Sequence, residues 1–330
     1  MNKTLRNVGI IGTGSYVPEE IRPNSYFEKV GSSDEWIYKT LGIKERHIAA
    51  ADEATSDLAA KAGLKAIADA NLTVDDIDLI IVATATPDRP APATACFVQD
   101  KIKAYNAAAF DMLAVCAGFM YGMSIATQYI ATSTYNNVLV IGADTFSRIT
   151  DWERRDSVFF GDGAGAAVLS HTDDDCGFLG FKIRSDGRGK YGFTIPGGGS
   201  EMPMSHEVIE KRLQYWHMDG QAVYKSATTV VPKVIRDILD ETGLKPEDVD
   251  CVIPHQPSMN MLKTIFKDVG IPWEKVQTNM DKYANTSGGT VAIMLDETNK
   301  AGKLKKGDIV LFAAIGSGWT WSSAILKWSK

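Results

Sequence analysis

An internal repeat constrains the fold of this chain more than any other feature of its sequence. The segment LTVDDIDLIIVA, residues 72–83, aligns with LKPEDVDCVIPH, residues 244–255, and each follows a predicted helix. NNVLVIGA, residues 136–143, aligns with GDIVLFAA, residues 307–314, so the two pairs occur in the same order at offsets of 172 and 171. Each half also closes with a glycine-punctuated apolar strand, GDGAGAAVLS and GWTWSSAILK. Two pairs in the same order indicate a duplication.

Within each repeat, segments rich in valine and isoleucine alternate with segments of helix length. The sequence predicts buried strands at residues 79–85, 137–143, 250–256 and 308–316. It predicts helices over Thr55–Ala70, Gly118–Thr132, Gly220–Thr242, Met259–Val269 and Gly288–Ala301. This alternation is typical of α/β layers with a largely parallel sheet. We divide the chain into an N-terminal half, residues 1–172, and a C-terminal half, residues 173–330.

Length and charge exclude several classes of protein. The chain of 330 residues is 45% hydrophobic, and a chain of this length accommodates two units of roughly 150 residues. A net charge of −6 gives no broad basic surface for nucleic acid. No apolar run reaches the ~20 residues of a membrane helix. Glycine and tyrosine interrupt the N-terminal segment before a signal-peptide core is complete. We therefore expect a cytoplasmic protein with no nucleic-acid or membrane partner.

The cysteines show neither CxxC nor metal-ligand spacing, so we expect no disulfide framework and no metal site. They are Cys96, Cys116, Cys176 and Cys251, and each is either an inert core residue or a reactive thiol. Cys116 stands in DMLAVCAGFMYGM, after a predicted strand and before a helix that begins near Ala117. The positive end of a helix macrodipole favours the thiolate, which is the nucleophilic form. This stretch alone supports the core and the reactive interpretation about equally.

Two polar residues of the second half are candidates to share a site with Cys116. His255 ends the strand in CVIPHQPS, at the carboxyl end where open α/β sheets place ligands, although a structural histidine would also explain it. Asn285 lies in YANTSGGT, a glycine-rich loop before a predicted helix. Helix capping would explain Thr286 or Ser287 and does not require Asn285. Corresponding ends of the two repeats are expected to meet, which would bring the three candidates together.

Taken together, these motifs resemble those of the β-ketoacyl-acyl-carrier-protein synthase III family, the initiating condensing enzymes with the thiolase fold. The matching motifs are GTGSYVPE, SSDEWI, GIKERHIAA, VCAGF, FGDGAGAAVL, PHQ, YANTSGG and GSGWTWSSAIL, in that order. The resemblance covers essentially the whole chain. It implies a thiolase-like α/β fold with duplicated halves in five α-β-α-β-α layers, and a homodimer. It implies no permanently bound cofactor, because the thioesters of coenzyme A or phosphopantetheine are substrates.

By this resemblance, Cys116 is the nucleophile that stores an acyl group as a thioester. His255 and Asn285 would donate hydrogen bonds to the carbonyl of a malonyl thioester, where negative charge develops as CO₂ leaves. The backbone N–H groups of Cys116 and Ser317 would stabilise the second tetrahedral oxygen. The product is a β-ketoacyl thioester, made in fatty-acid initiation or in a specialised fatty-acid or polyketide-type pathway, with acyl carrier protein as a partner.

The resemblance also assigns binding residues, some of which depart from the family's pattern. Those expected to bind coenzyme A or the carrier protein are Trp36, Gln221, Lys225, Ser258 and Lys267. Thr40, with Lys39 beside it, and Asn260 stand where the family commonly has arginines. Lys263 and Lys267 could replace the charge missing at Asn260, and further candidates for a basic rim are Lys225, Arg154 and Arg155.

The acyl pocket is expected to include Ala91, Phe146, Phe160 and Ile315, with Ala91 near the dimer interface. Ala91 and Ile315 replace aromatic residues of the family's best-known members. Because a smaller side chain opens volume, we expect a starter group larger than acetyl, or differently shaped.

Two other functions would use the same residues. An acyltransferase would move the acyl group from Cys116 to an alcohol or amine, with His255 as general base, and release of CO₂ from a malonyl thioester distinguishes a condensing enzyme from it. A non-catalytic subunit of a heteromeric synthase has no need of a complete Cys116, His255 and Asn285 set. The altered nucleotide-binding and docking positions favour a specialised pathway over housekeeping initiation.

Overall fold

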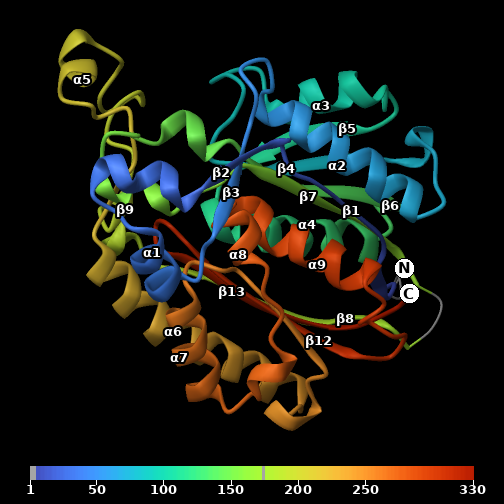
Figure 1. The fold of residues 1–330 in the computed structure, drawn as a ribbon. Helices are drawn as coiled ribbons and strands as arrows, with labels where there is room; N and C mark the ends of the chain where they lie inside the picture. The colour runs from blue at the N-terminus through green and yellow to red at the C-terminus, as the bar shows by residue number, and fades with distance from the viewer. Residues whose placement is uncertain (1–4, 173–174) are drawn as a thin grey trace.

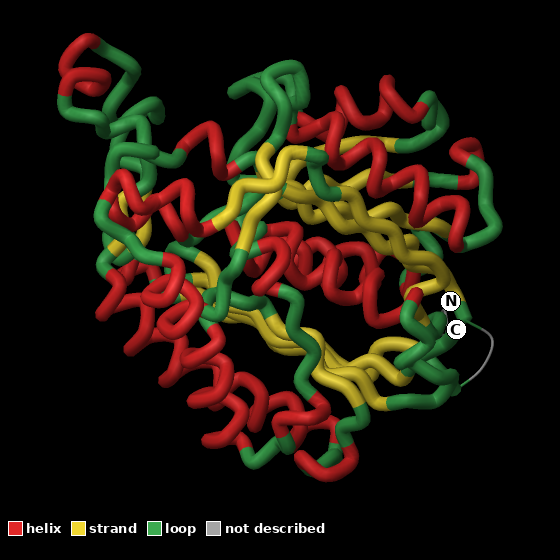
Figure 2. The backbone as a smooth tube through the Cα atoms, viewed as in Figure 1, coloured by secondary structure: helices red, strands yellow, loops and turns green. Residues whose placement is uncertain are grey.

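Two β-sheets lie face to face, with helices between them and on both outer faces (Figure 1). The computed structural model describes residues 5–172 and 175–330. Helices α2 (Thr55–Asp69) and α3 (Thr94–Ile102) cover the first sheet, and α6 (Gly220–Thr242) and α7 (Met259–Val269) cover the second. Helices α4 (Gly118–Ala131) and α9 (Thr290–Lys300) fill the central layer, as Figure 2 shows. The predicted five-layered α-β-α-β-α fold is confirmed.

The strands divide between the sheets at the middle of the chain. The first sheet contains β1 (Val8–Tyr16), β4 (Leu79–Ala83), β5 (Ala108–Met112), β6 (Asn137–Asp144) and β7 (Gly163–His171). The second contains β8 (Gly177–Ser185), β11 (Cys251–Pro254), β12 (Ile309–Gly316) and β13 (Thr320–Lys327). Two small two-stranded sheets pair β2 (Glu20–Pro23) with β3 (Glu45–Ile48), and β9 (Phe193–Thr194) with β10 (His217–Met218). The remaining α-helices of the described ranges are α1 (Asp34–Leu41), α5 (His206–Glu210) and α8 (Met280–Tyr283).

The strand order makes the duplication visible. The first sheet runs β1-β7-β6-β4-β5, and the second, taken from its other edge, runs β8-β13-β12-β11. The aligned segments therefore occupy equivalent places, with β4 matching β11, β6 matching β12 and β7 matching β13. The chain passes from the first sheet to the second between β7 and β8. The predicted boundary after residue 172 falls there, but residue 173 lies outside the described residues, and the division into two domains stays a prediction.

The expectation of a largely parallel sheet is wrong, because both sheets are mixed. In the first sheet β4 pairs in parallel with β5 and β6, whereas β7 runs antiparallel to both β6 and β1. In the second sheet β11 and β12 are parallel, and β13 runs antiparallel to β12 and β8. The reason lies in the connections: a short turn joins β12 to β13, and only antiparallel strands can be joined by so short a link.

The two helices of the central layer, α4 and α9, hold in place the loops that precede them. Helix α4 contacts both sheets, and its sequence GFMYGMSIATQYIA carries no charged residue, as expected for a helix that is buried over most of its length. Gln128 and Tyr129, near its C-terminal end, are exposed. Phe119 and Met123 of α4 and Leu295 of α9 are fully buried between the sheets, and such a side chain stabilises the fold by ~1.5–3 kcal/mol. No helix of the described ranges is long and apolar enough to cross a bilayer.

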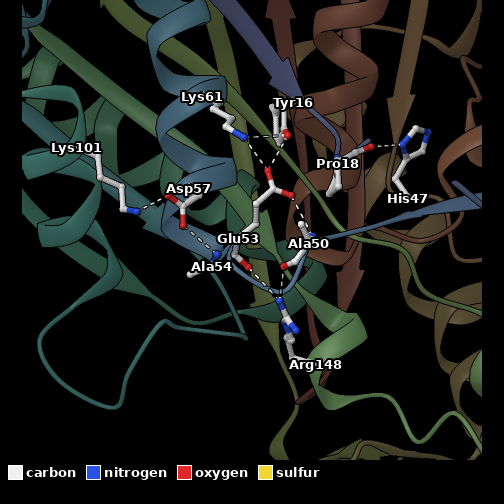
Figure 3. A network of polar contacts seen from close by, with 10 residues as sticks. All are labelled: Tyr16, Pro18, His47, Ala50, Glu53, Ala54, Asp57, Lys61, Lys101 and Arg148. Atoms are coloured by element: carbon white, nitrogen blue, oxygen red, sulfur yellow. Dashed lines mark hydrogen bonds and ion pairs between the residues drawn. The ribbon is translucent and has the colours of Figure 1, made fainter. Parts of the chain in front are cut away.

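A polar network fixes the loop between β3 and α2 (Figure 3). The Glu53 carboxylate accepts hydrogen bonds from the Tyr16 hydroxyl and the Lys61 ammonium, each at 2.7 Å. Although burial acts to raise the pKa of Glu53, the bonds from Lys61 and Tyr16 hold it below its ordinary value. The Arg148 guanidinium donates to the Ala50 carbonyl at 2.6 Å. Arg148 belongs to the 3₁₀ turn Phe146–Ile149, so the network anchors the segment that carries Phe146.

Candidate active site

An apolar cavity of about 310 Å³ lies among α1, α6, α7 and the turn between β12 and β13. Cys116, His255 and Asn285 all line it, although they come from three distant segments and from both halves of the chain. Most of the other lining residues are apolar, and they include Val115, Phe159, Phe160, Phe193, Met218, Val223, Met261, Ile315 and Trp319. The cavity therefore places a thiol, an imidazole and a carboxamide where a single small acyl group would touch them.

The backbone around Cys116 is unusual. The residue lies in the 3₁₀ turn Val115–Ala117, which leads directly into α4. Val115 has a φ of 46°, a left-handed conformation that costs a β-branched residue on the order of 1–3 kcal/mol. A Cβ atom on Gly316 would lie 3.0 Å from the Cys116 amide nitrogen and 2.5 Å from the Ala114 carbonyl oxygen. Only glycine at position 316 lets the β12–β13 turn pack against the backbone of Cys116.

The Cys116 thiol is protonated at neutral pH. Burial raises its pKa to about 12; the hydrogen bond with Ser287 acts in the opposite direction, and the negative charge of Asp144 adds to the rise. The helix N-terminus therefore does not lower the pKa of Cys116 enough to make the thiolate the main form at neutral pH. A macrodipole contributes ~0.3–1 kcal/mol at most sites, whereas a single pKa unit corresponds to about 1.4 kcal/mol. The Cys116 sulfur lies 3.6 Å from Ser287 Oγ, to which it donates a hydrogen bond.

His255 follows β11 directly, as the sequence predicts. Its backbone N–H donates to the Ala313 carbonyl of β12 at 2.8 Å, which extends the parallel pairing by one residue. Burial lowers the pKa of His255 to about 3, so the imidazole is neutral at physiological pH. Its Nδ1 atom is buried and has no hydrogen-bond partner within the described residues. A neutral imidazole at this position can donate one hydrogen bond without adding a charge to the cavity.

Asn285 is held by residues of the first half. Its N–H donates to the Phe159 carbonyl and its own carbonyl accepts from Gly161 N–H, both at 3.1 Å. Its side-chain Oδ1 accepts a hydrogen bond from the Ser287 N–H at 2.8 Å. Because that bond occupies the amide oxygen, the amide nitrogen is the group that remains to donate to a ligand.

The interpretation of Thr286 and Ser287 as helix caps is wrong. Neither side chain accepts a hydrogen bond from a backbone N–H at the start of α9, whose preceding residue is Gly289; the Thr286 hydroxyl instead pairs with the Thr290 hydroxyl at 3.2 Å. A capping residue needs an extended backbone, but Ser287 has a φ of 51° within a 3₁₀ turn. This conformation directs its hydroxyl toward Cys116 instead. The turn packs tightly on the first half, since a Cβ atom on Gly142 would lie 2.1 Å from the Gly288 carbonyl oxygen.

Ser317 lies beside Cys116 on the β12–β13 turn. Its hydroxyl donates to the Phe193 carbonyl at 2.5 Å, and Thr320 Oγ1 donates to the Ala114 carbonyl at 3.0 Å. The Thr320 bond fixes the turn against the segment that precedes Cys116, and the Ser317 bond ties the turn to β9. They bring the peptide groups of Ser317 and Cys116 to neighbouring positions on the cavity wall.

The residues expected to bind coenzyme A or the carrier protein divide into two groups. Ser258 lines the cavity and caps α7 by accepting a hydrogen bond from Met261 N–H at 3.2 Å. Trp36, Gln221, Lys225 and Lys267 do not line it. Helices α1, α6 and α7, which carry those four residues, do border it through other residues, including Thr40, Tyr224 and Asn260. The Arg155 guanidinium lies 4.9 Å from the centre of the Trp36 ring, whose side chain is 37% exposed.

The predicted acyl-pocket residues are also divided. Phe160 and Ile315 line the cavity. Phe146 lies behind it, with its ring centre 4.5 Å from that of Phe160. Ala91 is exposed and does not line the cavity of its own chain, so its role across a dimer interface stays a prediction.

Several lining residues were missed because they come from segments without clear periodicity. Phe193, Met218 and the supporting Trp216 belong to residues 186–218, where only short strands and a five-residue helix occur. The aromatic content of GFTIP and YWHM is the one signal that would have suggested a cavity wall. Asp144 was also missed, although an aspartate that ends a buried strand in NVLVIGAD needs a reason to be there.

The fold and this cavity define an enzyme of the thiolase-like condensing class, and comparisons with known proteins identify the family. Residues 110–187 match the family model described as 3-oxoacyl-[acyl-carrier-protein (ACP)] synthase III, and residues 239–328 match the model of its C-terminal part. The chain is 50% identical over 324 residues to beta-ketoacyl-[acyl-carrier-protein] synthase III of Caldanaerobacter subterraneus, covering 98% of each chain. It is 45% identical to that of Clostridioides difficile over 97% of this chain and 98% of the relative.

A solved structure gives the same result. The 3-oxoacyl-[acyl-carrier-protein] synthase III of Aquifex aeolicus superimposes with a TM-score of 0.91 at 39% identity, covering 97% of this chain and 100% of the other. The chain belongs to the β-ketoacyl-acyl-carrier-protein synthase III family, and it is an acyltransferase. The resemblance inferred from the motifs is confirmed. The relatives' names favour fatty-acid synthesis over the specialised pathway that the sequence suggested.

Proposed function

We propose that this enzyme condenses the acyl group of an acyl-CoA with malonyl-acyl-carrier-protein, with loss of CO₂, in the initiation of fatty-acid synthesis. The observation that carries this proposal is the convergence of Cys116, His255 and Asn285 on one apolar cavity. The names of relatives up to 50% identical support the same reaction.

In the first half-reaction, Cys116 attacks the thioester carbonyl of the acyl-CoA and becomes acylated. The peptide N–H groups of Cys116 and Ser317 stabilise the oxygen on which negative charge develops. The close packing of Gly316 on the Cys116 amide supports this pairing, because it brings the two peptide groups to the same wall. The apolar lining excludes water, which would otherwise hydrolyse the acyl-enzyme.

In the second half-reaction, the malonyl thioester loses CO₂ and its carbonyl oxygen becomes the oxygen of an enolate. The neutral imidazole of His255 and the amide nitrogen of Asn285 donate to that oxygen, and the bond from Ser287 N–H fixes the amide orientation. Because decarboxylation supplies the carbanion, no strong base has to remove a proton from carbon. The carbanion then attacks the acyl group on Cys116, and the β-ketoacyl thioester leaves.

The walls of the cavity support a starter larger than acetyl. Ile315 and Phe160 border the space next to Cys116, and Ile315 is smaller than the aromatic residue expected there. A comparison of acetyl-CoA with C6–C10 acyl-CoA donors tests this part of the proposal. Far better turnover of acetyl-CoA would overturn it.

The rim of the cavity supports binding of the nucleotide and the carrier protein. Trp36 with Arg155 offers a stacking surface for an adenine. Lys225 on α6, with Lys263 and Lys267 on α7, provides positive charge for the acidic carrier protein.

An exposed sheet edge supports a homodimer. Strand β5 is the edge of the first sheet and pairs within the described chain only with β4, and Leu113, which follows it, is 70% exposed. Unpaired edges of this kind are usually covered. Asp111 of β5 accepts hydrogen bonds from Thr94 and Ala95 N–H, which keeps the loop containing Ala91 close to this edge. We place the enzyme in the cytoplasm, where its acyl-CoA substrate is found.

The deciding experiment separates the two half-reactions. Incubation with hexanoyl-CoA followed by peptide mass spectrometry should show one acyl adduct, on Cys116. Addition of malonyl-acyl-carrier-protein should then release CO₂ and a β-ketoacyl product. Cys116→Ala should form no adduct. An adduct that passes to an alcohol or amine without CO₂ release would refute the condensing function.

A further inference from the structure

Polar groups lie side by side from the nucleophile to a buried carboxylate. The Cys116 thiol donates to Ser287 Oγ at 3.6 Å. The neighbouring Gly288 N–H donates to Asp144 Oδ2 at 2.8 Å, and the Ser287 side chain acts to lower the pKa of Asp144. Ser287 and Asp144 are both fully buried. The proposed half-reactions use the backbone N–H of Ser287 but give neither side chain a role.

The donors around Asp144 fit the ionised form at rest. Oδ1 accepts from Ala85 N–H at 2.8 Å, from Thr86 Oγ1 at 2.9 Å and from Thr84 Oγ1 at 3.1 Å. Gly288 N–H donates to Oδ2, so each of these partners is a donor. Burial nevertheless raises the pKa of Asp144, so a proton that reaches it is held more firmly than by an exposed carboxylate.

The cavity cannot easily hold a second negative charge. Asp144 is the one charged group of the described residues whose field acts on the Cys116 thiol. Ionising Cys116 beside an ionised Asp144 would place two negative charges in an apolar environment. If the proton passes to Asp144 instead, the site carries one negative charge before and after the transfer.

The imidazole of the cavity is a poor acceptor for this proton. Burial lowers the pKa of His255 to about 3, so an imidazolium there would be a strong acid. Ser287 has the right geometry for a transfer in either direction. Its hydroxyl accepts from the thiol, and the N–H of the next residue binds Asp144, so the hydroxyl stands between the thiol and the carboxylate.

We propose that Ser287 and Asp144 form a proton relay that serves Cys116, an inference that rests on the proposed function. As Cys116 attacks the acyl-CoA, the thiol proton passes to Ser287 Oγ and the Ser287 hydroxyl proton passes to Asp144. Asp144 keeps that proton throughout the life of the acyl-enzyme and returns it when Cys116 is released. Ser287 touches the reacting sulfur and is a catalytic residue, whereas Asp144 acts through it.

The atoms and charges balance in both half-reactions. In acylation, the S–C bond to Cys116 forms, the S–C bond to coenzyme A breaks, and coenzyme A leaves as a thiolate that takes a proton from solvent. In condensation, the carbanion left by CO₂ forms a C–C bond to the acyl carbon, and Cys116 leaves as a thiolate that recovers the proton from Asp144 through Ser287. One proton is consumed per turnover, as the overall reaction requires.

The relay predicts proton uptake during acylation alone. Wild-type enzyme is mixed with hexanoyl-CoA in weak buffer near pH ~7, where a free thiol of pKa ~8.5 is protonated, and a pH indicator is followed by stopped flow. We expect about one proton taken up per Cys116 adduct counted by mass spectrometry. If the thiol proton simply accompanies coenzyme A, uptake is zero, and zero uptake overturns the proposal.

Variants of the two relay residues test whether the thiol proton of Cys116 reaches Asp144. Ser287→Ala and Asp144→Asn should abolish uptake per adduct and slow acylation at least ~10²-fold. Asp162→Asn is the matched control, because Asp162 is also fully buried and accepts from Ala49 and Ser147 N–H at 2.8 and 2.9 Å. It should retain the uptake. Full uptake in Ser287→Ala overturns the relay.

A measurement on the wild-type enzyme tests the relay even where the variants do not fold or do not become acylated. The infrared difference spectrum of acylated minus free enzyme should contain the carbonyl band of a protonated carboxyl group, shifted by ¹³C labelling of aspartate. Absence of that band overturns the proposal. Absence of the adduct itself would instead refute the proposed function, so the two failures are distinguishable.

Discussion

Replacement of Gly142 by alanine tests whether the contact between the two halves positions the active site. A Cβ atom there would lie 2.1 Å from the Gly288 carbonyl oxygen and 2.8 Å from its carbonyl carbon. Both are backbone atoms of the turn that also carries Ser287, so the clash cannot be relieved by rotating a side chain. Overpacking of this kind costs ~1–3 kcal/mol of unfolding free energy.

The same displacement should reduce activity more than stability. Gly288 lies between Ser287 and α9, and Asn285 precedes it by three residues, so a shift of the turn moves both functional side chains. A misplacement of ~1 Å can lower a rate ~10²-fold. We expect Gly142→Ala to lose ~1–3 kcal/mol in urea denaturation and at least ~10²-fold in the rate of Cys116 acylation.

The control is Gly63→Ala in α2. There the new Cβ atom would meet only the tips of Leu139 and Ile141, at 3.2 and 3.3 Å, and alanine favours a helix by ~0.8–1 kcal/mol over glycine. This variant should keep its activity and lie within about 1 kcal/mol of the wild type. If Gly142→Ala were as stable and as active as Gly63→Ala, the assigned role of the Gly142–Gly288 contact would be wrong.

Three further predictions follow from the cavity. Alkylation of Cys116 by iodoacetamide should accelerate ~10-fold per pH unit above neutrality, since burial raises the thiol pKa to about 12; a plateau below pH ~9 would contradict this. Asn285→Ala should slow malonyl decarboxylation ~10²–10³-fold while acylation falls much less, and equal losses in both steps would argue against its assigned role. His255 has a folded pKa of about 3, below the unfolded value of ~6.5. In the pH window between these two values, the unfolded chain therefore binds more protons than the folded chain. Wild type should therefore lose more unfolding free energy than His255→Gln as the pH falls through that window, and parallel curves in urea denaturation would refute the assignment.

The duplication and the strands could be predicted because buried strands and their helices repeat in the sequence. The aligned segments 72–83 and 244–255 lead into β4 and β11, which occupy the same place in their sheets. His255 was found because it ends such a strand, and Cys116 because it stands before a helix. The short link between β12 and β13 would have predicted an antiparallel pair, whereas an apolar strand such as β7 carries no signal that separates parallel from antiparallel pairing.

The finer chemistry of the site depends on backbone conformation that residue type does not reveal. Ser287 looked like a helix cap, and a φ of 51° turns its hydroxyl to Cys116. The pKa of Cys116 depends on burial and on Asp144, a residue far away in the sequence. The aromatic wall formed by Phe193 and Trp216 comes from a segment whose apolar residues follow neither helix nor strand spacing.

The assembly of the cavity from both halves has a consequence for synthesis of the protein. A ribosome completes the nucleophile's strand and helix well before it adds β11, the loop of Asn285 and the hairpin that carries Ser317. A nascent or truncated chain therefore bears the cysteine without its hydrogen-bond donors or its closing turn. The proposed half-reactions therefore need residues from the late part of the chain as well as Cys116, and a partial copy would lack them.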